Sequence, residues 1–452
     1  MKIGLIAMSG VRAQNKELLE MGLTLPGFVE RSKVIASLPS LSLLTLAALT
    51  PSRFQVEYRE ILDLKTAGNL PDDYDLVAVT SLSAQIHEAY AVADHYRENG
   101  VPVIMGGLHV TSRPDEALEH CTSVVVGEGE ASWPSVLNDF ERGCLRPRYV
   151  QSPHGRYDLR EAPLPRFDLL EPEKYNRITV QTSRGCPHKC EFCASSILLT
   201  PGYKVKPVEK VMAEIDAIKS IWPKPFIEFA DDNSFVHREH YKRLLRALAG
   251  QGVRWFTEAD ISVAQDGELL GLMRDSGCQQ VLIGLESPRA ASLNGIETNA
   301  NWKARRLESY GAAIARIQSF GITVNGCFIL GLDGDTPGIF EEVLDFVRQS
   351  GLYEVQITVM TAFPGTPLHA RLESEGRIIR ENAWEMCTLF DVNVRPANMT
   401  VAELEQGFRG LARELYSAEE TRARRRAYWG RLRTSLNRPR QRRDSTPALV
   451  GS

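Results

Sequence analysis

Three cysteines in one short segment carry the clearest chemical signal of the chain. Cys186, Cys190 and Cys193 follow directly on residues 178–182, an apolar, β-branched run that predicts a strand. Three thiolates at this spacing can converge on one soft-metal centre. A structural zinc site or an ordinary ferredoxin-type cluster would need a fourth ligand nearby, and we interpret His188, inside the loop, as a neighbour instead. We therefore predict an oxygen-sensitive [4Fe-4S] cluster with one iron left open for a substrate.

Polar residues and glycines stand at the ends of later predicted strands. Asp231 and Asp232 end one strand, Glu286 and Ser287 end another, and Gly331 closes a third. Taken singly, an Asp pair often caps a turn and a strand glycine often serves packing. Because all of them fall at the carboxyl ends of strands that follow the cysteine loop, we expect them to belong to one site.

Strand-like runs alternate with helix-length segments in two successive series, which indicates parallel sheets. The first series predicts a doubly wound, Rossmann-like sheet, and the second predicts six βα units, as in a partial (β/α)6 barrel. The strands expected in the first series are residues 2–8, 55–61, 75–80, 101–105 and 123–126. Those expected in the second are residues 178–182, 226–230, 253–257, 280–285, 322–330 and 354–359.

The chain divides into four parts on this pattern. The first domain spans residues 1–145, and the Pro- and charge-rich residues 146–176 are interpreted as a linker. The barrel spans 177–370. Residues 371–452 form a helical C-terminal part that ends in a basic tail, with ten arginines between Arg422 and Arg443.

The cysteine loop and the strand-end residues together resemble the radical S-adenosylmethionine (SAM) superfamily. The resemblance implies that the open iron chelates SAM and that one electron from the cluster cleaves a carbon–sulfur bond. It also implies that Phe192 abuts the adenine and that Asp231, Asp232, Glu286, Ser287 and Gly331 contact the cofactor. The protein would then position cofactor and substrate and exclude quenchers.

Residues of the first domain resemble the cobalamin-binding domain of cobalamin-dependent radical SAM proteins. The resemblance is carried by Gly106, Gly107 and His109 after one strand and by Glu128 after the next, which it implies are cobalamin contacts. Glycines at strand ends let the backbone approach a flat ligand closely. The D-x-H-x-x-G motif, whose histidine ligates cobalt in many methyl-carrying domains, is absent.

Three functions remain open on this reading. The first is methylation of an unactivated centre of a metabolite via methylcobalamin, in specialised biosynthesis. The second keeps radical SAM chemistry but performs cyclisation, rearrangement or 3-amino-3-carboxypropyl transfer, with or without cobalamin. The third is a non-catalytic iron–sulfur protein with a binding or sensing role. For the first two functions we expect a small-molecule substrate and an external electron donor such as flavodoxin or ferredoxin.

Composition indicates an ordinary globular chain, with 43% apolar and 24% charged residues and a net charge of −4. No apolar run approaches the roughly 20 residues needed to span a bilayer. The N-terminus leads straight into a strand without a signal-peptide cleavage region, so we expect a cytoplasmic protein. The basic tail lacks an accompanying aromatic groove, and we expect no nucleic-acid partner.

Overall fold

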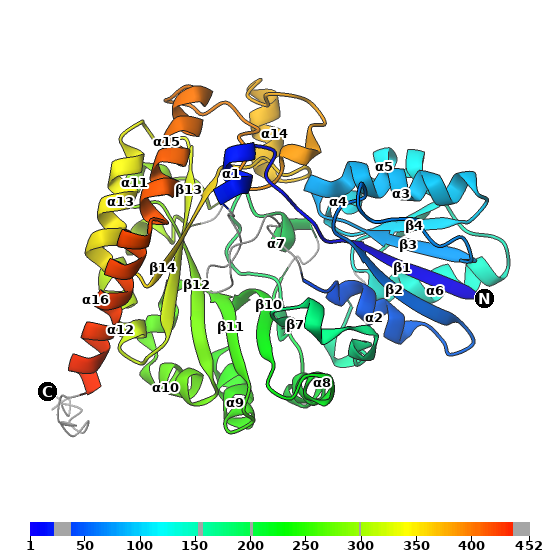
Figure 1. Ribbon diagram of the computed structural model, residues 1–452, viewed down its shortest axis with the longest axis horizontal. Helices are drawn as coiled ribbons and strands as arrows, with labels where there is room; N and C mark the ends of the chain where they lie inside the picture. Colours follow the sequence, from blue (N-terminus) through cyan, green and yellow to red (C-terminus); the bar gives the residue numbers. More distant parts are fainter. Residues whose placement is uncertain (22–37, 152–156, 199–201, 298–299, 437–452) are drawn as a thin grey trace, which may run out of the picture.

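The computed structural model describes residues 1–21, 38–151, 157–198, 202–297 and 300–436. Two α/β lobes lie side by side, and a group of C-terminal helices packs on the second lobe (Figure 1). Within the described ranges, no helix is both long and apolar enough to cross a membrane.

The first lobe contains a six-stranded parallel sheet in the order β2-β1-β3-β4-β5-β6. Alternate residues of each strand face opposite helix layers: α3 and α5 cover one face, and α2 and α6 cover the other. This arrangement confirms the Rossmann-like, doubly wound fold. The strands are β1 (Lys2–Met8), β2 (Gln55–Ile61), β3 (Leu76–Thr80), β4 (Val103–Gly106), β5 (Ser123–Val126) and β6 (Arg148–Val150). The helices are α1 (Lys16–Met21), α2 (Leu41–Leu49), α3 (Ile86–Glu98), α4 (Leu108–Ser112), α5 (Pro114–His120) and α6 (Gly129–Glu141).

The expected boundary at residue 145 needs a correction. Strand β6 pairs in parallel with β5 and extends the first sheet to Val150, inside the segment interpreted as a linker. The rest of that segment forms short 3-10 turns, Leu159–Glu161, Phe167–Leu169 and Pro172–Lys174. Phe167 and Leu170 pack into the core of the second lobe, so this segment is bound to the protein along its length after residue 157.

The second lobe is an open, partial barrel, as expected. Its parallel sheet has the order β14-β13-β12-β11-β10-β7, and β7 and β14 do not pair with each other. Helices cover its outer face, where the largest hydrophobic core lies. The strands are β7 (Ile178–Val180), β10 (Phe226–Ser234), β11 (Arg254–Ala259), β12 (Cys278–Glu286), β13 (Thr323–Leu330) and β14 (Glu354–Val359), and β8 (Ser183–Arg184) and β9 (Lys204–Val205) form a separate hairpin-like pair. The helices are α7 (Ala194–Leu198), α8 (Val208–Ile221), α9 (Arg238–Leu248), α10 (Gly267–Asp275), α11 (Ala290–Leu293), α12 (Tyr310–Gln318) and α13 (Ile339–Ser350).

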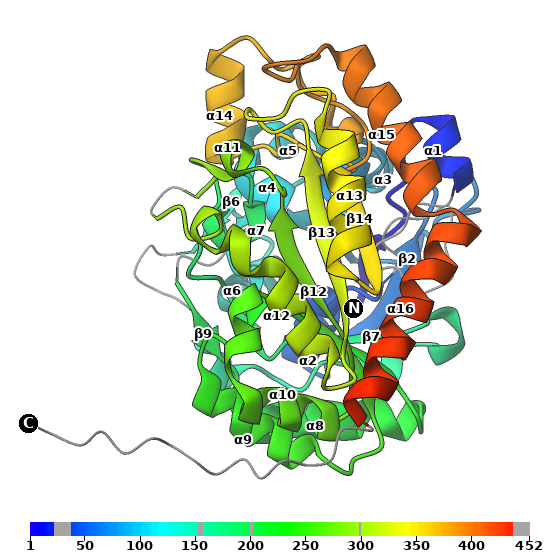
Figure 2. The same cartoon turned by 90° about the vertical axis from the view of Figure 1, so that its left-hand side faces the viewer.

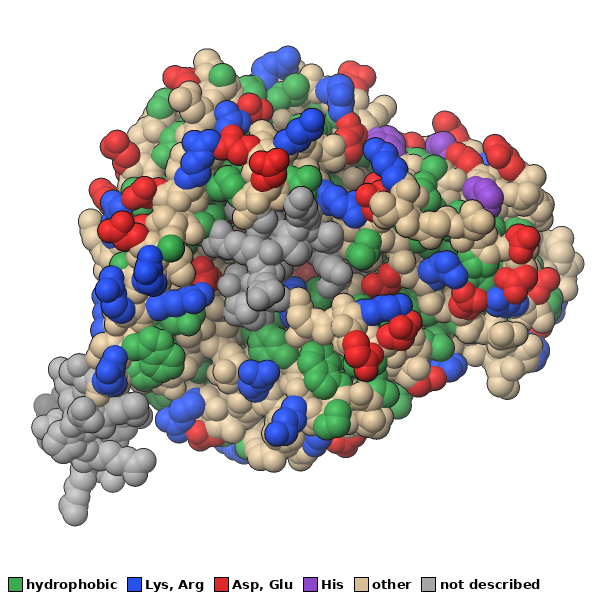
Figure 3. All heavy atoms as spheres, viewed as in Figure 1, with side chains coloured by type: hydrophobic (Ala, Val, Ile, Leu, Met, Phe, Trp, Pro, Cys, Tyr) green, Lys and Arg blue, Asp and Glu red, His purple; other side chains and the backbone are tan. Residues whose placement is uncertain are grey.

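The C-terminal part consists of α14 (Pro367–Ser374), α15 (Val401–Leu415) and α16 (Ala418–Leu436). Helix α16 runs down the side of the barrel next to α13 (Figure 2), and Lys and Arg side chains gather on the edge of the molecule where it lies (Figure 3). The first part of the predicted basic tail lies in α16 and packs against the rest of the fold. The Arg424 side chain is buried, donates to the Leu415 carbonyl at 2.7 Å and lies 3.6 Å from the Glu354 carboxylate. Residues 437–452 lie outside the described ranges.

Candidate functional site

The cysteine loop lies at the carboxyl end of the barrel sheet and is fixed from several sides. Asp232, at the end of β10, accepts a hydrogen bond from the backbone of Gly185 at 2.6 Å and another from the Ser195 hydroxyl. The Glu191 amide donates to the Ile296 carbonyl at 2.9 Å, and its carbonyl accepts from the Leu368 amide at 3.0 Å. The loop is therefore positioned by β10 and by the segments after β12 and β14.

The three predicted ligands are cysteines of this loop, of which Cys190 is buried and Cys186 and Cys193 are half-buried. In the described parts of the chain, no three His, Cys, Asp or Glu side chains converge closely enough to hold a single metal ion. A cubane cluster does not require that convergence, because each thiolate binds a different iron. The Asn233 amide lies 3.7 Å from the Cys186 sulfur and supplies the kind of hydrogen bond that tunes cluster sulfurs. These residues fit a cluster better than a closed zinc site.

His188 belongs to a polar group beside the cysteines. Its ring nitrogens lie 3.3 Å from Asp260 and 3.7 Å from Glu297, and its ring lies 4.5 Å from that of Trp302. Hydrogen bonds from His188, Ser262 and Asn233 outweigh burial and lower the pKa of Asp260. The arrangement holds His188 next to the loop, in agreement with its interpretation as a neighbour.

Asp231 differs from the expectation that it contacts SAM. It lies on the helix-facing side of β10, where its carboxylate accepts from the backbone amides of Thr182 and Ser183, each at 2.8 Å, and from Ser234 and Tyr241 at 2.8 and 3.0 Å. Burial raises the pKa of Asp231, and this network fully occupies the carboxylate. Asp231 therefore holds the segment before the cysteine loop, and its neighbour Asp232 takes the inward position.

The end of β12 carries a buried ion pair. Glu286 has a positive φ of 63° and lies 2.5 Å from Lys303, which also donates to the Gly284 carbonyl at 2.8 Å. Burial alone would lower the pKa of Lys303, but the charge of Glu286 outweighs it and raises that pKa. The sequence does not identify Lys303 as a site residue, because Lys303 belongs to no motif. Ser287 is buried and accepts from the Arg289 amide at 3.2 Å, so it shapes the turn behind Glu286.

Gly331 and Phe192 occupy packing positions near the same strand ends. Gly331 has a φ of 88°, and a Cβ there would lie 2.8 Å from Leu404, so only glycine fits against α15. Phe192 packs against a small apolar cluster that joins the cysteine loop to the strand ends. That cluster contains Leu293, Ile296, Leu332, Met360, Ala362 and Leu368.

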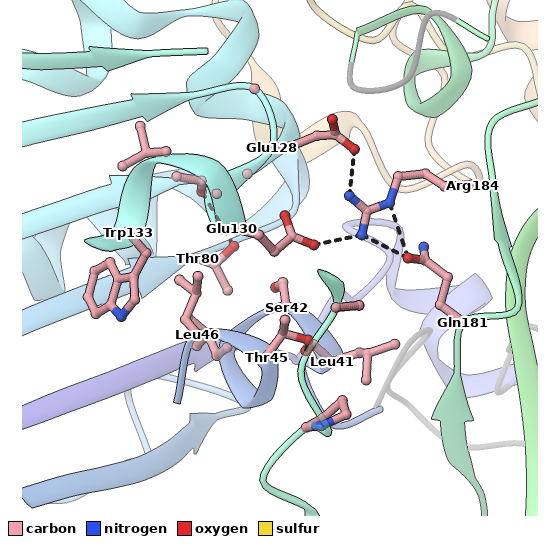
Figure 4. A pocket seen from close by; sticks show the side chains of 18 of the residues that line it. Leu41, Ser42, Thr45, Leu46, Thr80, Glu128, Glu130, Trp133, Gln181 and Arg184 are labelled. Carbon is pink, nitrogen blue, oxygen red and sulfur yellow. Dashed lines mark hydrogen bonds and ion pairs between the residues drawn. The ribbon is translucent and has the colours of Figure 1, made fainter. Parts of the chain in front are cut away.

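A cavity of about 320 Å³ lies between the two lobes. The carboxyl ends of β3, β4 and β5 and helix α2 form one wall, and Gln181, Arg184 and Asp232 contribute to the other (Figure 4). The backbone of Gly106, Gly107, Gly127 and Gly129 also lines it. Asp232 both lines this cavity and holds the cysteine loop, so the cavity and the loop are adjacent.

The lining fits a flat ring such as the corrin of cobalamin. The strand ends present glycine backbone to the cavity, and at Gly107 and Gly127 a positive φ of 106° and 95° favours glycine. Leu41, Leu46 and Trp133 supply apolar surface. Among the described lining residues there is no histidine, in keeping with the missing D-x-H-x-x-G motif.

Glu128 lines the cavity, and its carboxylate is also held by the second lobe. The Glu128 carboxylate pairs with Arg184 at 2.6 Å and Lys204 at 2.8 Å, both from the second lobe. Burial alone would raise the pKa of Glu128, but hydrogen bonds from Lys204, Gln151 and Arg184 outweigh it and lower that pKa. Glu128 thus joins the lobes at the cavity rim.

His109 is buried away from the cavity. Its ring nitrogens lie 3.1 Å from the Ser83 hydroxyl and 3.4 Å from Glu116, and burial lowers its pKa. The ring also lies against Trp384 at 5.3 Å. Because the side chain is enclosed by these partners, we interpret His109 as a structural residue.

Three family models match separate parts of the chain. The Radical SAM superfamily matches residues 180–347, the B12 binding domain matches 67–137, and a domain of unknown function (DUF4070) matches 366–450. Bacteriochlorophyllide d C-12(1)-methyltransferase of Chlorobaculum tepidum is 29% identical over 83% of this chain and 82% of that protein. Hopanoid C-2 methylase of Rhodopseudomonas palustris is also 29% identical, over 77% of this chain and 67% of that protein.

Solved structures share the complete architecture. The radical SAM methyltransferase TsrM of Kitasatospora setae, with cobalamin and a [4Fe-4S] cluster bound, superposes with a TM-score of 0.65 over 96% of this chain and 99% of that chain, at 16% identity. The cobalamin-dependent radical SAM enzyme OxsB, with aqua-cobalamin bound, gives 0.58 over 85% of this chain and 56% of that chain, at 18% identity. At these identities the likeness shows the fold.

The cysteine loop at the mouth of a partial barrel, together with the match to the superfamily model, defines a radical SAM enzyme. The chain combines a B12 binding domain with a radical SAM domain, which is the domain arrangement of the cobalamin-dependent radical SAM family.

Proposed function

We propose that this protein is a cobalamin-dependent radical SAM methyltransferase that methylates an unactivated carbon of a small metabolite. The observation that carries the proposal is the position of Asp232, which anchors the cysteine loop and also lines the cavity between the lobes. Cobalamin held in that cavity would face SAM held at the cluster, as methyl transfer between them requires. Relatives named as methyltransferases, of a bacteriochlorophyllide and of hopanoids, support methylation over the other radical chemistries.

Each group of residues has a distinct part in this function. Cys186, Cys190 and Cys193 would hold the cluster, and Glu286 with Lys303 would present a fixed polar group to SAM. When bound, the cluster supplies the electron that cleaves SAM, and cobalamin carries a methyl group to the substrate. The loop fixed by Asp232 and the ion pairs of Glu128 would keep the two cofactors at a constant separation.

The reducing electron would come from an external donor such as flavodoxin or ferredoxin. An oxygen-sensitive cluster needs a reducing compartment, so we place the reaction in the cytoplasm.

The products formed from SAM test the proposal. Protein reconstituted anaerobically with iron, sulfide and cobalamin should yield both S-adenosylhomocysteine and 5′-deoxyadenosine with its substrate. 5′-Deoxyadenosine alone would favour cyclisation or rearrangement, and 5′-methylthioadenosine would favour aminocarboxypropyl transfer. SAM that stays intact under reducing conditions would contradict catalysis and leave the non-catalytic alternative.

The cysteine triple variant tests the cluster within this proposal. Cys186→Ala, Cys190→Ala and Cys193→Ala together should abolish the roughly four irons per chain expected of a [4Fe-4S] cluster, together with all SAM cleavage. Cys144→Ala is the matched control, because Cys144 is exposed in the first lobe, and it should change neither measurement. A full complement of iron in the triple variant would refute the ligand assignment.

A further inference from the structure

The inward face of the barrel sheet carries polar side chains that the proposed function does not use. On β10 to β14, one set of alternate residues packs into the helix-covered core, and the other set faces the barrel interior. We call the interior-facing residues below the strand ends the lumen. The lumen residues considered below are Thr179, Glu258, Gln280, Asn325 and Gln356.

Several lumen atoms are buried without a hydrogen-bond partner among the described residues. Both amide atoms of Asn325, the side-chain oxygens of Gln280 and Gln356, and the hydroxyl of Thr179 are in this state. Asn325 is 0% exposed and Gln356 is 6% exposed, so bulk solvent does not reach most of these groups. Buried polar atoms in proteins are almost always paired, and a cluster of unpaired atoms on adjacent strands therefore points to a polar ligand.

Glu258 is the charged member of the lumen. It lies on β11 at the level of Leu282, its side chain meets solvent inside the barrel, and it forms no ion pair or side-chain hydrogen bond with the described residues. Confinement among protein atoms, and the like charges of Glu228, Asp232, Asp231 and Glu286, raise the pKa of Glu258 to about 8.

The carboxylates around Glu258 already have partners. Glu228 pairs with Arg177 at 2.5 Å, and Glu286 pairs with Lys303 at 2.5 Å. Asp231 and Asp232 accept hydrogen bonds from backbone amides and hydroxyls. Among these carboxyl groups, Glu258 is the one for which the described chain supplies neither a cation nor a hydrogen-bond donor.

The register of the strands places Glu258 and the lumen amides at neighbouring levels. Glu258 pairs with Leu282, and Leu282 pairs with Asn325, so Glu258 and Asn325 share a level two strands apart. Two strand spacings are about 10 Å. Glu258 and Asn325 therefore border the same level of the lumen, with the half-buried Leu282 between them. Gln356 pairs with Cys327, one level nearer the strand ends and the cysteine loop.

The unpaired lumen atoms are mainly acceptors. The oxygens of Asn325, Gln280 and Gln356 and the carboxyl of Glu258 need donors. Among the described lumen side chains, the Asn325 amide nitrogen is an unpaired donor, and the unpaired Thr179 hydroxyl can donate or accept. A ligand that satisfies this set must be rich in donors. A protonated amine offers three N–H groups, and its positive charge would stabilise the ionised form of Glu258, which the unliganded interior disfavours.

We propose that Glu258, Asn325 and Gln356 bind the amine-bearing end of the substrate, so that the substrate is a nitrogen-containing polar metabolite. This inference rests on the proposed function, since it places the methyl acceptor in the barrel below SAM. By strand register, Glu258 and Asn325 are level with Leu282 and Gln356 is level with Gly284, all of them below Glu286, the predicted SAM contact on β12. This position leaves the three residues for the substrate.

A pair of matched probes tests the substrate class. Binding of n-hexylamine and n-hexanol to the anaerobically reconstituted full chain would be measured by ligand-observed NMR. The protonated amine should bind about tenfold more tightly than the alcohol, because charge-assisted hydrogen bonds are the stronger ones. Glu258→Gln should remove the preference, and Asn325→Leu should weaken amine binding. Glu98→Gln, an exposed position on α3, is the matched control and should keep the wild-type preference.

The outcomes separate this inference from the proposed function. Equal affinity of the two probes in the wild-type protein, or a preference that survives in both Glu258→Gln and Asn325→Leu, would overturn the inference. The iron content of each variant shows whether the variant is folded. If one of the two variants does not fold, Gln356→Met takes its place in the test. S-adenosylhomocysteine formation without an amine preference would contradict the inference alone. An amine preference without any SAM cleavage would contradict the proposed function alone.

Discussion

At the scale of single residues, the interior of the barrel is organised by pairing of charges. Glu228 is balanced by Arg177 and Glu286 by Lys303, and both carboxylates are largely withdrawn from solvent. A buried ion pair is not in itself strong evidence for stability, because desolvation offsets much of the attraction. Removing one partner is costly, however, because it leaves the other charge unpaired. The pair at the end of β12 therefore allows stability and cofactor binding to be separated.

We predict that Glu286→Ala lowers the free energy of unfolding by about 3 kcal/mol, because Lys303 stays buried without its partner. The double variant Glu286→Ala with Lys303→Met should recover most of that loss. SAM should bind weakly to both variants, because both lack the Glu286 carboxylate that faces SAM in the proposed function. Denaturant unfolding and equilibrium binding of SAM to the iron-loaded protein measure the two effects. Wild-type SAM affinity in the double variant would show that Glu286 does not contact the cofactor.

The sequence expectation for site residues failed where the outcome depended on which face of a strand a side chain takes. The three cysteines share one loop by their spacing, and their role as cluster ligands stays a prediction. Asp231 and Asp232 are adjacent, and a one-residue difference along a strand sends a side chain to the opposite face of the sheet. No periodic pattern in this polar segment distinguishes the two, so Asp231 was expected in the cofactor site and lies against α9 instead. Glu258 was missed because it belongs to no motif.

At the scale of elements, the predicted barrel strands agree with the observed ones to within a few residues, because β-branched runs bounded by helical segments are a strong signal. Strand β6 was missed because it has three residues in a Pro-rich context. The pair β8–β9 was also missed, since two-residue strands have no periodicity. Yet this small element carries Arg184 and Lys204, which hold Glu128 of the first lobe.

We predict that Arg184→Met loosens the junction between the lobes. The substitution removes ion pairs to Glu128 at 2.6 Å and Glu130 at 2.7 Å and leaves two carboxylates close together, which should cost about 1.5–3 kcal/mol. Limited proteolysis should then cleave the connecting segment 151–176 faster. Arg160→Met is the matched control, because the Arg160 side chain is 78% exposed and its ion pair should contribute little. Equal cleavage rates in wild type and Arg184→Met would contradict the assigned role.

At the scale of the whole molecule, the site exists only because two lobes meet. The cavity is lined by α2, three strand ends of the first sheet, the segment that joins the lobes, and the start of the barrel. No local pattern in the sequence predicts such a convergence, although the order of the domains permits it. The same arrangement would determine the surroundings of cobalt, since cobalamin in this cavity would take its neighbours from both lobes.

The last prediction concerns those surroundings. Because the described lining contains no histidine, cobalamin bound here should lack an imidazole on its lower face. An imidazole donates electron density and stabilises the higher oxidation states of cobalt, so its absence should favour reduction. Polarity and solvent exclusion around the corrin would then tune the metal. Electron paramagnetic resonance of the protein with cob(II)inamide, which lacks the benzimidazole base of cobalamin, should show no nitrogen superhyperfine splitting from an axial histidine. His109→Ala should leave that spectrum unchanged, since His109 lies away from the cavity against Ser83 and Glu116. Axial nitrogen splitting that disappears in His109→Ala would show that the histidine reaches cobalt after a rearrangement of the first lobe.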